Sequence, residues 1–366
     1  MSGRAWRCIP GRARAPASCF AFHAAHRPKC RRPKCLCRPP SNCAPPGGKS
    51  GRTVPVMSQA VATLPSPARS WPEGTAVTSF RASEPLTETI AENVERELSG
   101  MQETLGPNAD PELFVQVRIW ALSKLQHIGE LAASGLILPS GAAWPASLSG
   151  RPLRLGVFPI AANPLHWAHL LSGLAAMERF CLDKVLFVIA GSDPRKPDLA
   201  SQVIRHRISG EVLRLFHPLF EYSPIALGSL LPGEVNVFRI MASYGRRPMH
   251  AFYLAGSDHC HRLAPQTGQP DTIVKLEEGV CGASHGFDPR LHCLSVVFLD
   301  RGDCRKPVDS FLDVRWIEQL PLNTSSTRIR GALSGKEPLC ELAALPFTGY
   351  CALCTQGLYQ LGRISS

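Results

Sequence analysis

The first 72 residues contain no aspartate and no glutamate, and the first acidic side chain of the chain is Glu73. The same segment carries 13 of the 40 lysines and arginines, so the formal net charge of +11 originates there. From residue 73 onward the chain has 27 basic and 29 acidic residues, a net charge of −2. A nearly neutral body gives no electrostatic support for nucleic-acid binding, and we expect no specific binding of nucleic acid.

Long apolar runs are also missing. The longest ones, such as residues 183–190, have the length of a β-strand. A membrane-spanning helix needs roughly 18 or more apolar residues. The sequence also lacks the apolar core and cleavage site of a secretory signal. We therefore expect no membrane association, reduced thiols for the 14 cysteines, and a cytoplasmic location.

Residues 1–82 show no periodic apolar pattern and are predicted to form a disordered basic tail rich in Pro, Cys and Arg. Three other interpretations stay open. An arginine-rich, acid-free N-terminus is typical of an organelle transit peptide, although many cysteines and few serines are not. The four cysteines of residues 30–43 could bind a metal, but their spacing matches no standard zinc pattern. Translation could also begin at Met57.

Residues 83–136 are predicted to form a helical hairpin. Apolar residues with helical spacing follow Ser83, a candidate N-cap, and Gly100 lies near the expected end of the first helix. Asp110 and Pro111 form an N-cap followed by proline at the first helical position of the second helix. Because the hairpin lacks clustered reactive side chains, we interpret it as an element for packing or for homo-oligomerisation.

A linker rich in Pro, Gly and Ser is expected at residues 137–151, and strands alternate with helices over residues 152–361. This alternation is typical of an α/β, Rossmann-like fold, in which helices cover both faces of a parallel sheet. Strands are predicted at residues 153–159, 184–190, 219–223, 249–255, 293–299 and 314–317. Helices are predicted at residues 165–180, 199–216, 232–245, 270–278, 325–334 and 348–357.

Two histidines open the first helix of this domain. The preceding apolar strand ends in a turn at Asn163-Pro164, and His166 and His169 follow in the first helical turn. Residues three apart on a helix share a face. Because a helix N-terminus presents free N–H groups and the positive end of the dipole, this pattern suits an anion such as a phosphate. Two ordinary, partly buried histidines would give the same spacing.

Two further polar segments each follow a predicted strand. Residues 190–197 place a glycine turn beside two cations, Arg195 and Lys196, which suits a phosphate and would equally fit a solvated basic loop. Gly256 and Asp258 follow the next strand. Glycine allows a ligand to approach the backbone, and the carboxylate could accept ribose hydroxyls or cap the next helix.

A fourth segment opens a helix with hydroxyl side chains. Ser325, Ser326 and Thr327 are followed by Arg330 one turn later. Together with the free N–H groups of the helix, these side chains could converge on a polyphosphate. Helix capping alone would also explain the hydroxyls.

The order of these four segments over residues 153–361 resembles the nicotinate mononucleotide adenylyltransferase family, within the cytidylyltransferase-like class of nucleotidylyltransferases that carry an HxGH signature. Residues 155–164, LGVFPIAANP, align without gaps on the strand and turn of that family, which reads like IGIFGGTFDP, and His166-x-x-His169 falls on HxGH. Three further segments are similar to its Pro-Pro-His-Lys, Gly-x-Asp and SSTxIR motifs: residues 194–196, 256–258 and 325–330.

The resemblance implies an enzyme that transfers AMP from ATP to a pyridine mononucleotide and releases pyrophosphate, in NAD biosynthesis. The implied partners are ATP and a mononucleotide, with Mg²⁺ held mainly by the phosphates and not by protein ligands. The implied catalytic residues are His166, His169, Lys196 and Arg330. The implied nucleotide-binding residues are Phe158, Asn163, Arg195, Gly256, Asp258, Ser325, Ser326 and Thr327.

The sequence departs from the family pattern at several positions. Pro159 and Ile160 replace two glycines, and a proline both fills space and removes an N–H donor. Ala168 replaces the glycine of HxGH, and Arg195 replaces the histidine of Pro-Pro-His-Lys. Residues 232–236, PGEVN, stand where the family has Ser-Tyr-Thr. A transferase with another acceptor and a regulatory homologue without turnover therefore stay open, as does the choice between nicotinate and nicotinamide.

Overall fold

The structure is a computed structural model that describes residues 87–139, 151–192, 198–282, 287–300, 308–318, 322 and 324–358. The basic tail predicted at residues 1–82 lies outside the described residues. So do residues 140–150 of the predicted linker and two candidate site residues, Arg195 and Lys196.

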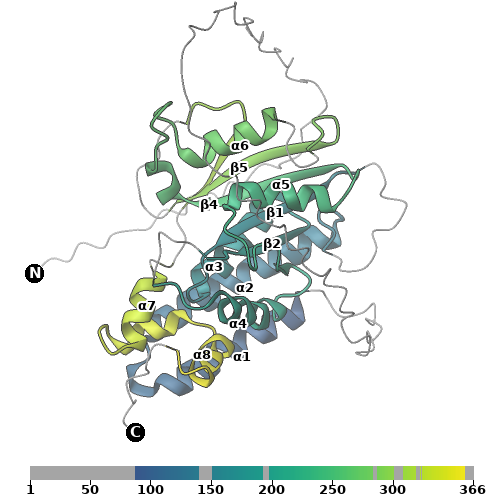
Figure 1. Cartoon of the computed structure of the whole chain (residues 1–366). Helices are drawn as coiled ribbons and strands as arrows, with labels where there is room; N and C mark the ends of the chain where they lie inside the picture. The colour runs from purple at the N-terminus through teal and green to yellow at the C-terminus, as the bar shows by residue number, and fades with distance from the viewer. Residues whose placement is uncertain are drawn as a thin grey trace, which may run out of the picture. The chain divides into compact units, whose positions relative to one another are not determined.

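The described residues form one parallel sheet of six strands in the order β3-β2-β1-β4-β5-β6 (Figure 1). The strands are β1 (Leu153–Ile160), β2 (Lys184–Ile189), β3 (Phe220–Ser223), β4 (Met249–Gly256), β5 (His292–Leu299) and β6 (Asp313–Ile317). This is the strand order of doubly wound dinucleotide-binding folds. The α/β Rossmann-like fold predicted from the sequence is therefore confirmed, and each strand lies within a few residues of its predicted position.

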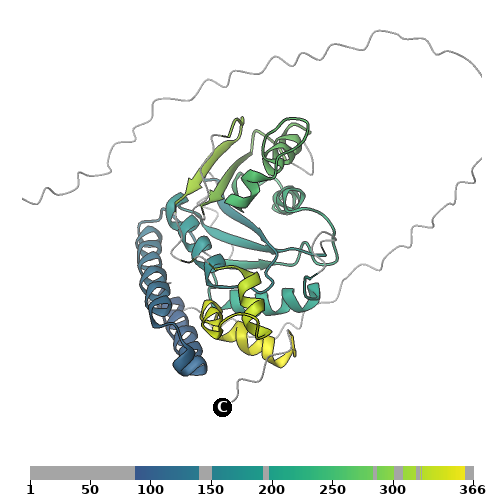
Figure 2. The same ribbon diagram turned by 90° about the vertical axis from the view of Figure 1, so that its left-hand side faces the viewer.

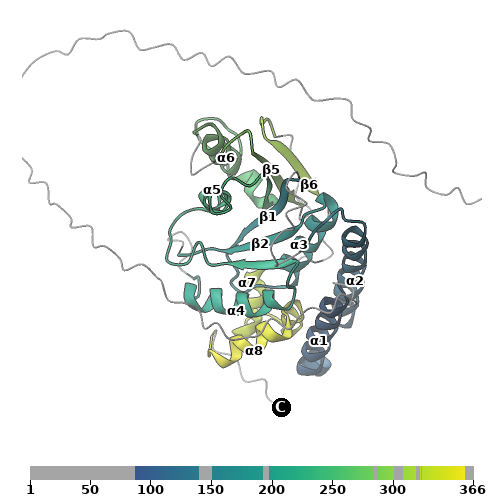
Figure 3. The same ribbon diagram turned by 90° about the vertical axis from the view of Figure 1, so that its right-hand side faces the viewer.

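Helices cover both faces of the sheet (Figures 1 and 3). They are α1 (Glu88–Leu105), α2 (Pro111–Ala133), α3 (Trp167–Phe180), α4 (Gln202–Arg214), α5 (Gly233–Ser243), α6 (Asp271–Cys281), α7 (Ser326–Leu333) and α8 (Phe347–Thr355). Helices α5 and α6 pack on one face, whereas α3, α4, α7 and α8 contribute to the core on the other. Within the described part of the chain, none of these helices is long and apolar enough to span a membrane.

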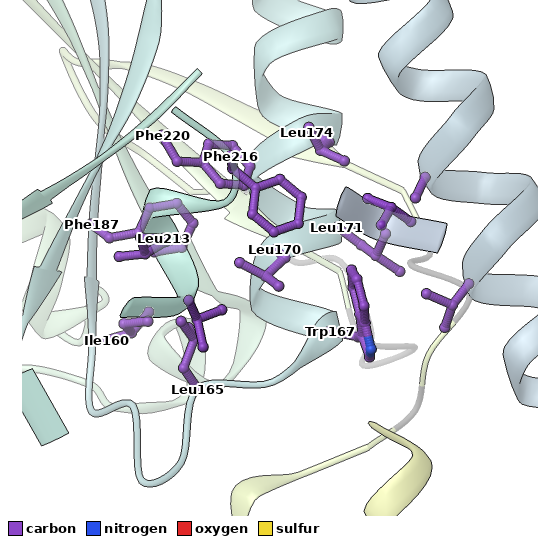
Figure 4. Packing of buried hydrophobic residues seen from close by; sticks show 14 of the residues in the cluster. Ile160, Leu165, Trp167, Leu170, Leu171, Leu174, Phe187, Leu213, Phe216 and Phe220 are labelled. Atoms are coloured by element: carbon purple, nitrogen blue, oxygen red, sulfur yellow. The ribbon is translucent and has the colours of Figure 1, made fainter. Parts of the chain in front are cut away.

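Alternate residues of β1 enter the two cores, because successive side chains of a strand point to opposite faces. Leu155 and Val157 pack with α5 and α6, whereas Phe158 and Ile160 pack on the α3 side. Figure 4 shows the apolar face of α3 meeting side chains from the end of α4, from the segment after it, and from β2 and β3. The labelled side chains are Ile160, Leu165, Trp167, Leu170, Leu171, Leu174, Phe187, Leu213, Phe216 and Phe220.

Helices α1 and α2 lie where the sequence predicts a helical hairpin, side by side along the outside of the domain (Figures 2 and 3). Helix α2 packs on α3, where Glu178 contacts Lys124 and the Nδ1 atom of His127, the latter at 2.6 Å. Helix α1 holds the start of α8, because the buried carboxylate of Glu97 accepts the N–H and the hydroxyl of Thr348, each at 2.7 Å. The hairpin thus shares its core with the sheet.

The expected end of α1 near Gly100 is wrong. The helix continues to Leu105 and ends at Gly106, whose φ is +51°. A Cβ on Gly100 would lie 2.7 Å from the Phe347 ring, so this glycine permits close helix packing and does not terminate the helix. The predicted cap of α2 is confirmed, since the Asp110 carboxylate accepts two first-turn N–H groups at 3.1 and 3.2 Å.

Candidate functional site

A cavity of about 450 Å³ lies at the carboxyl ends of β1 and β4, the point at which the strand order reverses. Open α/β sheets bind ligands at this position. The cavity brings together residues of three sequence motifs that are far apart in the chain. The predicted site residues that line it are Phe158, Asn163, His169, Gly256, Asp258, Ser326, Thr327 and Arg330.

The two predicted histidines have different surroundings. His169 lines the cavity, whereas His166 does not and is only 3% exposed. His166 is the N-cap of α3, and its backbone N–H donates to Nδ1 of His169 at 3.4 Å. The two rings lie 3.9 Å apart, centroid to centroid. Because Nδ1 of His169 accepts a hydrogen bond, the neutral ring carries its proton on Nε2, which makes it a donor.

Helix α7 is fastened to the β1–α3 turn although more than 160 residues separate them in sequence. The Ser326 hydroxyl donates to the Pro164 carbonyl at 3.2 Å, and the Arg330 guanidinium donates to the Asn163 carbonyl at 2.8 Å. These bonds place the hydroxyl-rich start of α7 on the same cavity as His169. The two motifs therefore form a single candidate anion site.

The hydroxyl residues at the start of α7 have two roles, because one caps the helix and two line the cavity. The Ser325 hydroxyl caps the helix by accepting the Arg328 N–H at 3.3 Å, and Ser325 does not line the cavity. Thr327 lines the cavity, and its hydroxyl accepts from Arg330 at 3.3 Å. The capping interpretation thus holds for Ser325, while Ser326, Thr327 and Arg330 face the space that a ligand would fill.

The β4 side of the cavity carries a carboxylate. Asp258 lies in the short helix η3 (Ser257–His261), whose N-cap is Gly256, so Asp258 does not cap it. Its carboxylate forms an ion pair with Arg262 at 2.8 Å, and both side chains are about half exposed. Arg262 also lines the cavity, which the sequence patterns did not indicate.

Asn163 joins the turn to the segment that precedes α4. Its amide nitrogen donates to the carbonyl of Asp198, and its amide oxygen accepts the N–H of Ala200, both at 3.2 Å. Asn163 is 2% exposed, so these bonds are shielded from water. The Asn163 side chain thus fixes the segment at residues 198–200 against the turn that lines the cavity.

Arg205 is a structural centre of the site that sequence reasoning missed. This arginine of α4 is 3% exposed and its guanidinium donates to four backbone carbonyls. The acceptors are Ala161 (2.6 Å), Ala190 (2.8 Å), Gly191 (2.6 Å) and Ala200 (2.9 Å). It thereby joins the chain segments that follow β1 and β2. The available signal was its position on the buried face of α4, three, seven and eight residues before Ile208, Val212 and Leu213.

A second cavity of about 510 Å³ adjoins the first. The two share six lining residues: Pro159, Ile160, Ala161, Leu199, His259 and Arg262. The second cavity is further lined by residues 190–192 and 230–234 and by the first turns of α6. Two adjoining cavities at one sheet edge provide room for two ligands.

Pro159 and Gly233 form a complementary pair at this second cavity. A Cβ on Gly233 would lie 2.7 Å from Cβ of Pro159 and 2.8 Å from the hydroxyl of Tyr253. The proline that replaces a family glycine therefore packs into space left by a glycine at the start of α5. Two departures from the family pattern, Pro159 and Gly233, are therefore in contact with each other.

Gly233→Ala is expected to destabilise the protein by about 1–3 kcal/mol, because the proline ring cannot bend away from the added methyl group. The Pro159→Gly background should reduce this penalty by about 1 kcal/mol, with the Tyr253 hydroxyl still limiting the space. Denaturant unfolding of both single variants and the double variant measures the coupling. Strictly additive effects would show that the two residues do not compensate each other.

The parallel sheet, the histidine turn and the hydroxyl-rich helix start on one cavity form an arrangement that resembles the HxGH nucleotidylyltransferases. No family model matches the chain. The chain is 26% identical over 219 residues to a probable nicotinate-nucleotide adenylyltransferase of Moorella thermoacetica, covering 58% of this chain and 95% of the relative. It is 23% identical over 218 residues to a protein of the same name from Desulfitobacterium hafniense, covering 59% and 100%.

A solved structure of Plasmodium falciparum nicotinic acid mononucleotide adenylyltransferase complexed with NaAD aligns at a TM-score of 0.43 and 12% identity, over 57% of this chain and 98% of that chain. The sequence similarity to the two bacterial relatives agrees with the resemblance that the motifs predict.

Proposed function

We propose that this protein transfers AMP from ATP to a pyridine mononucleotide, with release of pyrophosphate, as a step of NAD biosynthesis. The observation that carries the proposal is the meeting of three separated motifs on one cavity. His169 comes from the β1–α3 turn, Asp258 follows β4, and Thr327 opens α7. The similarity to nicotinate-nucleotide adenylyltransferases over nearly their full length supports this choice of reaction.

The reaction needs no nucleophile from the protein. A phosphate oxygen of the mononucleotide attacks the α-phosphorus of ATP, a new P–O bond forms, and the bond to the leaving pyrophosphate breaks. The protein acts by positioning the phosphates and by stabilising the charge that moves onto pyrophosphate. In this proposal the α7 N-terminus and Arg330 bind the β- and γ-phosphates, His169 donates to a phosphate oxygen, and Asp258 accepts ribose hydroxyls.

The motif resemblance implies that His166 and Ser325 contact the ATP phosphates, but neither lines the cavity, so positioning roles are proposed for both. His166 would position His169 as the N-cap of α3. Lys196 and Arg195 follow β2 in sequence and are proposed to add positive charge near the transferred group. Ser325 contributes by fixing the first turn of the phosphate-binding helix.

Mg²⁺ is proposed to enter with ATP. It would be held mainly by the phosphates of ATP and not by protein ligands, because Mg²⁺ usually keeps several waters and binds through substrate phosphates. Among the described residues, Asp198 adds a carboxylate to the first cavity, which is compatible with a cation that enters with the phosphates. When bound, the ion would neutralise charge on the phosphates.

Purified full-length protein with ATP, Mg²⁺ and nicotinate mononucleotide is expected to form the dinucleotide and one equivalent of pyrophosphate, and a parallel reaction with nicotinamide mononucleotide tests the acceptor. Chromatography of the nucleotides measures both products, and omission of ATP is the control. ATP binding without dinucleotide from either acceptor would contradict the proposal. That result would favour a regulatory protein that binds the nucleotide without turnover. The missing backbone N–H at Pro159 would be consistent with such a loss of turnover.

A further inference from the structure

Two polar side chains, His259 and Arg262, line both cavities. If ATP fills the first cavity and the acceptor the second, the attacking phosphate and the α-phosphorus must meet where the cavities join. Polar groups at that junction therefore lie closest to the reacting atoms. Arg262 is about half exposed and paired with Asp258, so its position is only loosely constrained. His259 is held differently.

A buried carboxylate lies behind His259. Glu234, the second residue of α5, is 7% exposed, and its carboxylate accepts the hydroxyl of Thr272 at 2.9 Å. The hydroxyl of Tyr253 also donates to Glu234, and burial together with this carboxylate raises the pKa of Tyr253 well above its ordinary value. Both hydroxyls are thus protonated donors around one carboxylate.

The direction of the next hydrogen bond follows from the number of protons. Thr272 has one hydroxyl proton, which it gives to Glu234, so its oxygen can only accept from a further partner. That partner is Nδ1 of His259, 2.9 Å away. Nδ1 therefore carries a proton, and the carboxylate, acting through the threonine, fixes the orientation of the ring.

We propose that His259 is a catalytic residue of the adenylyl transfer, which contacts the acceptor phosphate at the junction of the two cavities, and that Thr272 and Glu234 are its positioning residues. With Nδ1 held by Thr272, the ring offers its Nε2 edge to the acceptor phosphate and positions that phosphate as it approaches ATP. This inference rests on the proposed function. It adds to His169 a second histidine, on the acceptor side.

The test compares His259→Ala with His261→Ala, a change of the exposed histidine at the end of the same short helix, which does not line either cavity. His259→Ala is expected to lower kcat/KM for the mononucleotide about 100-fold and to change ATP affinity less than about twofold. His261→Ala should match the unchanged protein. Equal kinetics of the two variants would overturn the proposal, and His259→Gln provides a second variant that keeps a polar side chain.

Thr272→Val, which is nearly isosteric, tests the positioning role. As a single substitution it should lower kcat/KM for the acceptor about tenfold. Added to His259→Ala, it should cause no further loss. Equal losses in both backgrounds would mean that Thr272 does not act through His259. Thermal unfolding of each variant identifies any loss that comes from misfolding.

The proposed function can fail separately from this inference. Absence of dinucleotide from the unchanged protein with both acceptors would contradict the function alone. Calorimetric titration with each mononucleotide then decides the contact: weaker binding to His259→Ala than to His261→Ala supports it. Equal binding to both variants, or no binding to the unchanged protein, overturns it.

Discussion

His169→Ala is expected to lower kcat by about 100- to 1,000-fold while the dissociation constant of the mononucleotide changes less than about threefold. His169 lines the cavity that the first turns of α7 also line, and its Nδ1 accepts the backbone N–H of His166. The neutral ring therefore offers a donor at Nε2 to charge that develops on the phosphates. Initial rates at saturating ATP, with calorimetry for the acceptor, measure both quantities.

His169→Asn is the matched control for the capping role of this residue. An asparagine oxygen can accept the His166 N–H and so preserve the start of α3, but the side chain lacks a donor at the position of Nε2. Loss of the cap in the alanine variant should reduce stability by roughly 1 kcal/mol, and the asparagine variant should recover most of it. Recovery of turnover along with stability would show that His169 has a structural role only.

The local parts of this site were predictable because each motif is contiguous. A strand, a turn and a helix start can be recognised within the fifteen residues 155–169, and hydroxyls at a helix N-terminus are recognisable from residues 325–330. The family resemblance then predicted that these separate motifs belong to one site. The sheet order followed no local pattern, yet it is the sheet order that places β1 beside β4 and brings Asp258 to the same cavity as His169.

The parts that the sequence did not predict depend on contacts between distant segments. Glu234, Thr272 and His259 open or form three different helices, and each alone reads as an ordinary polar residue of a first turn. The wrong helix end at Gly100 has the same origin. A glycine in a helix pattern indicates either a helix end or a close contact, and only the position of Phe347 decides between them.

Pro159 and Gly233 compensate each other in size. A proline in place of a glycine fills space and removes an N–H donor, and the ring of Pro159 contacts Gly233 on the α5 side of the sheet. Pro159 lines both cavities, so under the proposed function it would affect the acceptor side as well as the ATP side. Acceptor choice is therefore the property that this substitution should influence most.

Arg205→Ala is expected to reduce the free energy of unfolding by about 3–5 kcal/mol, because several buried carbonyls would lose a charged donor and each unsatisfied buried acceptor costs about 1–3 kcal/mol. The change would leave four carbonyls without the guanidinium donor that now joins them, in a region that is 3% exposed at the arginine. Arg207→Ala is the matched control, because Arg207 lies two residues away on the exposed face of the same helix. Denaturant unfolding of both variants measures the difference, and equal midpoints would contradict the assigned role.

Arg205→Lys distinguishes the contribution of Arg205 to stability from its contribution to the shape of the site. An ammonium group has three donors on one atom and cannot reproduce the planar fork that reaches four carbonyls. We expect it to recover part of the stability but to leave Ala161 and Gly191 less firmly held, and these residues line the second cavity. Acceptor KM should therefore rise by about tenfold in a protein that is still folded. An unchanged acceptor KM in the folded lysine variant would mean that Arg205 stabilises the domain without shaping the site.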